Sequence, residues 1–266
     1  IWHSLFMNIK VLWLRRSSWC FCEFNLNVMM HFSNFFLQFI YQCYIFISFN
    51  LTRIILFQDL NLADILEIIM VPYYAIALQT TVNAVNGCTT RNEARSVMDT
   101  TLERLKVEIF AAKKFIGSDV RLVVLPEYFL TAYPMGDTIK GWAEKASLSA
   151  DGPEYAKLGG IAKDNDIFIS GNAYEVDPHF EGLYFQTSFI IDPKGEVILR
   201  YRRLNSMFSP TPHDVWDKYL DIYGLEGVFP VADTEIGKLA CIASEEILYP
   251  EIARMFFIRG AEVGLH

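Results

Sequence analysis

The sequence predicts an α/β protein in which helices cover a mixed β-sheet, and two observations lead to this prediction. After residue 70, short apolar runs alternate with a helical pattern, and this order favours a sheet with helices packed on it. Further along, two extended runs flank a turn that contains proline and glycine, which predicts an antiparallel hairpin. We therefore expect an α/β or α+β layered sandwich.

The first predicted elements are a strand, a long helix and a second strand. The first strand covers Tyr73 to Gln79, and its continuous apolar centre is typical of a strand buried on both faces. A helix follows from about Arg91 to Phe115, because apolar residues recur at three- and four-residue spacing. The second strand, Arg121 to Leu125, ends at Pro126, so Glu127 is expected at its carboxyl end.

A second helix and three strands follow. Pro153 can occupy the first position of a helix that runs to about Lys163, and a strand is expected from Ile167 to Ser170. The hairpin has arms at Tyr184 to Ile191 and Glu196 to Tyr201, joined by a turn at Asp192 to Gly195. Arg203 comes directly after the second arm.

The stretch after Gly237 predicts a strand, a sharp joint and a helix. Leu239 to Ala243 is a buried strand, and Pro250 opens a helix. Ser244 lies at the joint, at the carboxyl end of a strand, where open α/β proteins place ligands and chemistry. The acidic pair Glu245 and Glu246 follows at once.

The two ends of the chain differ from its centre. Residues 1–67 contain neither glycine nor proline, on which turns and caps depend, so we interpret residues 1–69 as a non-native leader and residues 70–266 as one domain beginning at Met70. A membrane anchor at residues 35–57 is the alternative, although its polar residues, such as Arg53, would be costly in a bilayer. The chain stops within an expected buried strand near residue 266, which predicts a domain incomplete at its carboxyl end.

Composition excludes several classes of function. A net charge of −8 and a pI near 5.2 argue against a nucleic-acid-binding surface. The domain holds only Cys88 and Cys241, so no disulfide framework is expected and a cytoplasmic location is the default, with membrane anchoring as the alternative if residues 1–69 are genuine. Motifs for nucleotide or zinc binding are absent from the sequence.

Three predicted strand ends carry groups that suit acyl transfer. Glu127 can act as a base, Ser244 can attack as a nucleophile, and Arg203 can supply positive charge. Spacing alone does not show that the three converge. His213 and Asp214 could form a Ser-His-Asp arrangement with Ser244, but no Gly-x-Ser-x-Gly motif surrounds the serine.

A family resemblance joins these positions. It rests on the motifs Leu125-Pro-Glu-Tyr-Phe-Leu-Thr-Ala-Tyr-Pro134, Asp151-Gly-Pro-Glu154, Arg200-Tyr-Arg-Arg203, and Gly237 through Ser244 to Tyr249-Pro-Glu251 with Arg259-Gly-Ala-Glu262. In this order they resemble the signatures of the nitrilase superfamily, the carbon-nitrogen hydrolases. The resemblance covers nearly all of residues 72–266. It implies an α-β-β-α sandwich, a symmetric homo-oligomer, and hydrolysis of a small nitrile, amide or carbamoyl compound without a metal or organic cofactor.

The resemblance also implies roles for single residues, with two departures. Glu127 matches the family's general base, whereas Arg203 stands where the family has lysine and Ser244 where it has the nucleophilic cysteine. A hydroxyl ionises less readily than a thiol, so Glu127 would have to deprotonate it. Glu245 and Asp214 are possible supporting acids, and Cys241 is expected to be a buried structural residue.

Two functions remain open from the sequence. The first is an amide-type carbon-nitrogen hydrolase with a Glu127, Arg203 and Ser244 site. The second is a catalytically inactive binding protein on the same scaffold, because two of three family positions have changed and a fold does not by itself confer function.

Overall fold

The computed structural model of the protein describes residues 72–266. The leader and the start at Met70 that the sequence predicts, and the alternative membrane anchor, lie outside the described residues. Within residues 72–266, no helix is both long enough and apolar enough to cross a membrane.

One mixed sheet contains six strands among the described residues. These are β1 (Tyr74–Ala77), β2 (Val120–Val124), β3 (Leu148–Ser149), β4 (Phe168–Val176), β5 (Phe185–Ile191) and β6 (Val197–Arg202). Their order is β1-β2-β4-β5-β6, with β3 paired to β4 beyond this path. The β1-β2 and β2-β4 pairs are parallel, whereas β4-β5 and β5-β6 are antiparallel. The predicted mixed sheet and its hairpin are therefore confirmed.

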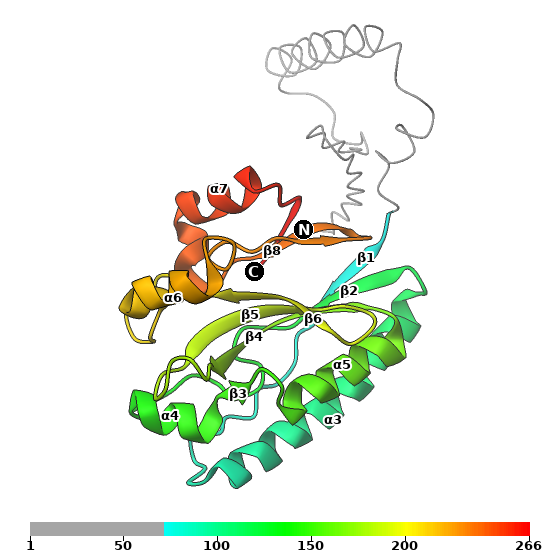
Figure 1. Ribbon diagram of the computed structural model, residues 1–266. Coiled ribbons are helices and arrows are strands. Elements are labelled where there is room, and N and C mark those ends of the chain that lie inside the picture. Colours follow the sequence, from blue (N-terminus) through cyan, green and yellow to red (C-terminus); the bar gives the residue numbers. More distant parts are fainter. Residues whose placement is uncertain (1–71) are drawn as a thin grey trace, which may run out of the picture. The chain divides into compact units, whose positions relative to one another are not determined.

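Helices cover one face of this sheet (Figure 1). They are α3 (Arg91–Ile116), α4 (Ile139–Ala146) and α5 (Pro153–Asn165). Thr90 caps α3 in a capping box with Glu93, and Pro153 opens α5 as predicted. Apolar residues of α3 and α5, among them Leu105 and Leu158, pack with Ile169 of β4 in one buried cluster. This cluster is the first of two cores.

A second, three-stranded sheet lies against the other face within the described part of the chain (Figure 1). It consists of β7 (Ala232–Thr234), β8 (Gly237–Cys241) and β9 (Val263–Leu265), in the order β7-β8-β9. Leu239 of β8 shares a buried cluster with Leu122 of β2 and Ile190 of β5, so the second core joins the two sheets.

The outer helices complete the layers. Helix α7 (Pro250–Ile258) packs Ile252 and Phe256 into the second core, and α6 (Trp216–Tyr223) packs Tyr219 there. Figure 1 shows α7 beyond the three-stranded sheet, so helices, sheet, sheet and helix follow one another. The described fold is thus the predicted α/β layered sandwich.

Several elements differ from the sequence-based expectation. Strand β4 extends to Val176, well past Ser170, and its later polar residues Asn172 and Glu175 are buried rather than exposed to solvent. The expected extended piece at residues 228–232 becomes β7, shifted to Ala232–Thr234. Helices α4 and α6 were not predicted.

Candidate active site

A cavity of about 200 Å³ opens between the two sheets, near the carboxyl ends of β2 and β8. Its lining comprises Val124, Leu125, Glu127, Ser170, Gly171, Asn172, Ser188, Ile242, Ala243, Ser244, Leu265 and His266. Two of the three sequence-predicted site residues, Glu127 and Ser244, are therefore brought to one cavity from positions more than a hundred residues apart in the chain. Drug-sized ligands usually occupy roughly 300–1,000 Å³, so this cavity suits a smaller molecule.

Ser244 occupies a strained turn. Strand β8 ends at Cys241, and the short 3-10 helix η2 (Ser244–Leu248) begins three residues later. The φ angle of Ser244 is 52°, in the left-handed region that residues with a Cβ rarely adopt. Such strain is concentrated at functional sites, where the surrounding structure holds it in place. The joint predicted from the sequence is thus a sharp turn that presents the serine to the cavity.

Glu127 lies at the mouth of the cavity and is exposed to solvent. It follows β2 and Pro126, as the sequence predicts. Its carboxylate accepts a hydrogen bond from Nε2 of Gln186. The next residue, Tyr128, donates from its hydroxyl to Oε1 of the same glutamine at 3.1 Å. Burial, followed by the negative charge of Glu127, raises the pKa of Tyr128, which keeps this donor protonated.

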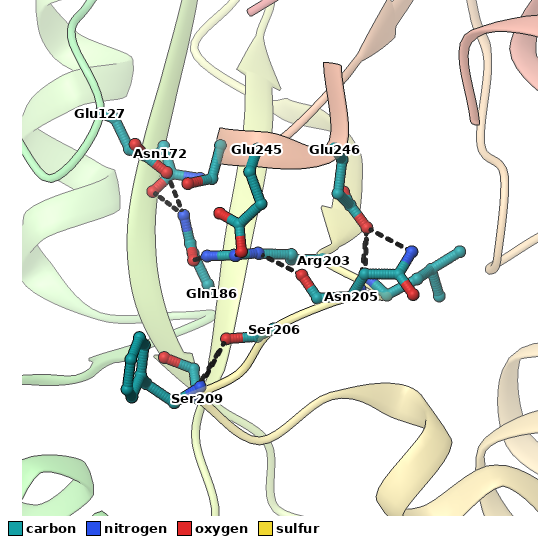
Figure 2. A network of polar contacts seen from close by, with 12 residues as sticks. Glu127, Asn172, Gln186, Arg203, Asn205, Ser206, Ser209, Glu245 and Glu246 are labelled. Carbon is teal, nitrogen blue, oxygen red and sulfur yellow. Dashed lines mark hydrogen bonds and ion pairs between the residues drawn. The ribbon is translucent and has the colours of Figure 1, made fainter. Parts of the chain in front are cut away.

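Arg203 is buried beside the cavity but is not among the residues that line it. Its Nη1 donates to Oε1 of Gln186 at 2.6 Å, and its Nε donates to the carbonyl oxygen of Asn205 at 2.6 Å. Its Nη2 forms an ion pair with Glu245. Figure 2 shows the guanidinium held between these acceptors. Arg203 therefore contacts protein groups on all three nitrogens.

Glu245 lies next to both Ser244 and Arg203. Burial acts to raise the pKa of Glu245, but hydrogen bonds from the Ser244 hydroxyl and a backbone amide, together with the charge of Arg203, outweigh burial and lower it. Glu245 is therefore the carboxylate that contacts the Ser244 hydroxyl, and its lowered pKa keeps it ionised at neutral pH. Glu127 reaches the same cavity from the opposite sheet.

Glu246 is fully buried and ties the end of β6 to the turn at Ser244. It accepts hydrogen bonds from the Tyr201 hydroxyl at 2.6 Å and from the backbone amides of Leu204 at 2.8 Å and Asn205 at 2.9 Å. Burial raises the pKa of Glu246, although these donors and Arg203 oppose the rise. The contacts fix the loop after Arg203 against η2, so they position the whole arginine-serine side of the site.

Two other candidates lie elsewhere. Asp214 accepts from the backbone amide of Thr211 at 2.7 Å and caps the 3-10 helix η1 (Pro212–Val215), and neither Asp214 nor His213 lines the cavity. Cys241 is buried, as expected, and desolvation raises the pKa of its thiol to about 12. Its sulfur lies 3.9 Å from Oγ of Ser170. A thiol that stays protonated is a poor nucleophile.

A sequence model of the family described as carbon-nitrogen hydrolase matches residues 64–266. The chain belongs to the carbon-nitrogen hydrolase family. This membership was predicted from the motifs, and it agrees with the described α/β sandwich.

The chain is similar to two proteins over about half of their length. A hydrolase of Schizosaccharomyces pombe is 30% identical over 165 residues, which cover 62% of this chain and 48% of that protein. A formamidase of Bacillus cereus is 30% identical over 173 residues, which cover 64% of this chain and 48% of the relative. The chain thus spans about half the length of the curated relatives it matches.

Among solved structures, a carbon-nitrogen hydrolase from Helicobacter pylori is 21% identical with a TM-score of 0.49, covering 72% of this chain and 58% of that one. A Saccharomyces cerevisiae member of branch 10 of the nitrilase superfamily is 22% identical with a TM-score of 0.49, covering 63% of this chain and 58% of the other.

Sequence reasoning missed three polar residues of this member of the carbon-nitrogen hydrolase family. Gln186 joins Arg203 to Glu127, while Asn172 and Ser188 line the cavity. A signal was present: Gln186 and Ser188 lie two residues apart in β5, so their side chains share one face of the sheet. A polar pair on a buried strand indicates a polar space between the layers.

Proposed function

We propose that the protein hydrolyses carbon-nitrogen bonds of small non-peptide amides through an acyl-enzyme formed on Ser244. The observation that carries the proposal is the joint presence of Ser244, on a strained turn, and Glu127 in a cavity of about 200 Å³. A carbamoyl or nitrile substrate belongs to the same chemistry. An amide is favoured because a hydroxyl is less suited than a thiolate to attack a nitrile carbon.

The proposed reaction has two halves. Oγ of Ser244 attacks the amide carbonyl carbon, and Glu127 takes the hydroxyl proton as the carbon-oxygen bond forms. The carbon-nitrogen bond then breaks, and the leaving ammonia receives that proton. In the second half, water attacks the serine ester while Glu127 accepts a proton from it. The carboxylic acid departs, and Ser244 regains its hydrogen.

Arg203 takes a different part from the one expected of a cation at this position. Arg203 does not line the cavity, and three of its five N–H donors face Gln186, Asn205 and Glu245, so this geometry does not support direct stabilisation of an oxyanion. In the proposed mechanism Arg203 instead holds Gln186 against Glu127 and keeps Glu245 ionised. It is a positioning residue.

The relatives add support of a general kind. The formamidase of Bacillus cereus shares 30% identity over 64% of this chain, and amide hydrolysis lies within the reactions of the family. From the family resemblance we also propose a symmetric homo-oligomer. The low cysteine content leads us to propose a cytoplasmic location, and the net charge of −8 leads us to propose that no nucleic acid is a partner. Light scattering of the full chain would measure the oligomer, and a monomer at micromolar concentration would contradict it.

Ammonia release from a panel of small amides tests the proposed function. The full-length protein is expected to release ammonia from at least one amide, and Ser244→Ala should abolish this release. Glu127→Gln should lower kcat by about a hundredfold or more, because general base catalysis contributes roughly 10²–10⁴-fold. Ser118→Ala, on an exposed residue after α3, is the matched control and should leave the rate unchanged. Activity that survives Ser244→Ala would reject the serine mechanism.

The second candidate is a binding protein on this scaffold. It is favoured by one observation, namely that the cation expected in the site contacts protein acceptors. A parent protein that binds amides without turnover, together with a Ser244→Cys variant that hydrolyses them, would support this candidate. Turnover by the parent would exclude it.

A further inference from the structure

A hydrogen-bond chain with a fixed direction starts at Arg203. A guanidinium group can only donate, so the Gln186 atom that Nη1 contacts at 2.6 Å must be the amide oxygen. The Tyr128 hydroxyl supports the same orientation by donating to that oxygen. The amide nitrogen of Gln186 therefore points away, toward Glu127 and toward Oδ1 of Asn172 at 3.3 Å (Figure 2).

The orientation of Gln186 also determines the orientation of the Asn172 side-chain amide. Its amide oxygen accepts from Gln186, so its amide nitrogen must face the other side. There Nδ2 donates to Oγ of Ser188 at 3.0 Å. Asn172 and Ser188 are paired across β4 and β5, which holds the two side chains side by side. The side-chain amides of Gln186 and Asn172 thus each have one orientation, and Arg203 determines both.

Ser188 is the last residue of this hydrogen-bond chain, and its hydroxyl can still donate a hydrogen bond. Its oxygen accepts from Asn172, and no hydrogen bond donated by its hydroxyl is found within residues 72–266. Ser188 is 5% exposed and lines the cavity. A buried hydroxyl hydrogen without a protein acceptor must find a partner in the cavity.

Depth in the cavity separates this donor from the reacting groups. Glu127 is exposed at the mouth, Ser244 is partly buried, and Ser188 is almost fully buried in the middle of β5. A substrate whose amide carbon lies at Ser244 would extend its other end toward Ser188.

We propose that Ser188 is a specificity-determining residue that donates a hydrogen bond to an acceptor oxygen on the far end of the substrate. The favoured substrates are then small amides whose carbon chain carries an ether, hydroxyl or carbonyl oxygen. This inference rests on the proposed function for the identity of the reacting group, but its binding part can be measured without turnover.

The test compares two amides of nearly equal size, methoxyacetamide and butyramide, which differ by an ether oxygen in place of a methylene. Dissociation constants for the full-length protein are measured by ligand-observed NMR, and ammonia release is followed in parallel. Wild-type protein should bind methoxyacetamide about three- to tenfold more tightly, as expected for one net hydrogen bond. Ser188→Ala should bring the ratio of the two constants to about one.

Asn172→Asp tests the donor-to-acceptor direction of the hydrogen bonds from Arg203 to Ser188 while leaving Ser188 in place. A carboxylate still accepts from Gln186, but it has no hydrogen to donate, so the Ser188 hydroxyl should turn and donate to it. The preference for methoxyacetamide should disappear in this variant too. Thr187→Val, on the neighbouring residue of the same strand, is the control and should keep the wild-type ratio.

The outcomes separate this inference from the proposed function. The expected binding pattern would support the role of Ser188 even without ammonia release, and absence of ammonia release from every amide of the panel would reject the hydrolase. Hydrolysis without a preference, or a preference that survives Ser188→Ala and Asn172→Asp, would overturn the role of Ser188 and leave the hydrolase standing. Failure to bind either amide would overturn the role of Ser188, and ammonia release from the wider amide panel would then decide the proposed function.

Discussion

Nη1 of Arg203 donates to Oε1 of Gln186 at 2.6 Å, and Nε2 of the same glutamine donates to Glu127. A single amide therefore connects the buried cation to the carboxylate at the cavity mouth. Because an amide has one oxygen and one nitrogen, the cation can sit outside the cavity and still orient the groups that line it.

Arg203→Lys should destabilise the fold even though it restores the residue type of the family pattern. One ammonium nitrogen cannot reach Gln186, Asn205 and Glu245 together, so a buried acceptor loses its partner. We expect a loss of about 1–3 kcal/mol in the free energy of unfolding, measured in urea. Arg259→Lys, at an ion pair with the exposed Glu226, is the control and should change stability by less than about 0.5 kcal/mol. Equal effects of the two changes would contradict the prediction.

Glu246→Ala should be among the most destabilising single changes at the site. It leaves the Tyr201 hydroxyl and the backbone amides of Leu204 and Asn205 without their buried acceptor. The expected loss is about 3 kcal/mol in urea unfolding, since such groups then carry their full desolvation cost. Glu181→Ala removes an exposed carboxylate and serves as control, with an expected effect below about 0.5 kcal/mol. A loss from Glu246→Ala as small as the control's would refute the role assigned to Glu246.

Glu245 should make stability sensitive to acid. Its folded-state pKa lies below the ordinary value of 4.5, so its contribution is fully present above that value and is lost as the pH falls through the lowered pKa. Wild type should therefore exceed Glu245→Gln in urea midpoint at about pH 7, and the gap should shrink as the pH falls below the ordinary carboxyl value of 4.5. The raised pKa of Glu246 acts with the opposite sign, but it is present in both proteins. A gap that widens on acidification would show that the assignment is wrong.

Alanine substitutions at two adjacent glycines of α5 should change the stability of the protein in opposite directions. A Cβ at Gly159 would overlap the carbonyl oxygen of Gly195 in the β5-β6 turn, whereas a Cβ at Gly160 would meet nothing within 4 Å. Gly159→Ala should cost about 1–3 kcal/mol by overpacking, and Gly160→Ala should gain about 0.5–1 kcal/mol of helix stability. Thermal unfolding of both variants measures this. The same sign for both would disprove the close approach of helix and turn.

The family motifs and strand ends were readable in the sequence because they are local. Apolar runs ended by Pro126 or followed by Ser244 identify strand ends, and their order predicts the layers. The family resemblance named Asp214 as a possible supporting acid. In the structure Asp214 caps η1, because an acidic residue three positions after Thr211 suits a local cap. Gln186 was missed because the polar residues of β5 indicate a polar space between the layers but do not identify the distant residues that Gln186 contacts.

The sequence by itself determined the order of the elements, the family and the positions of Glu127 and Ser244 at strand ends, because periodicity, turn residues and motifs act over short distances along the chain. Only the tertiary structure decided which polar groups meet. Gln186 contacts residues 59 positions before it and 17 after it, and Arg203 faces these partners rather than the cavity. Hydrogen-bond direction depends on the three-dimensional pairing of donors with acceptors, and the packing of the two sheets creates that pairing.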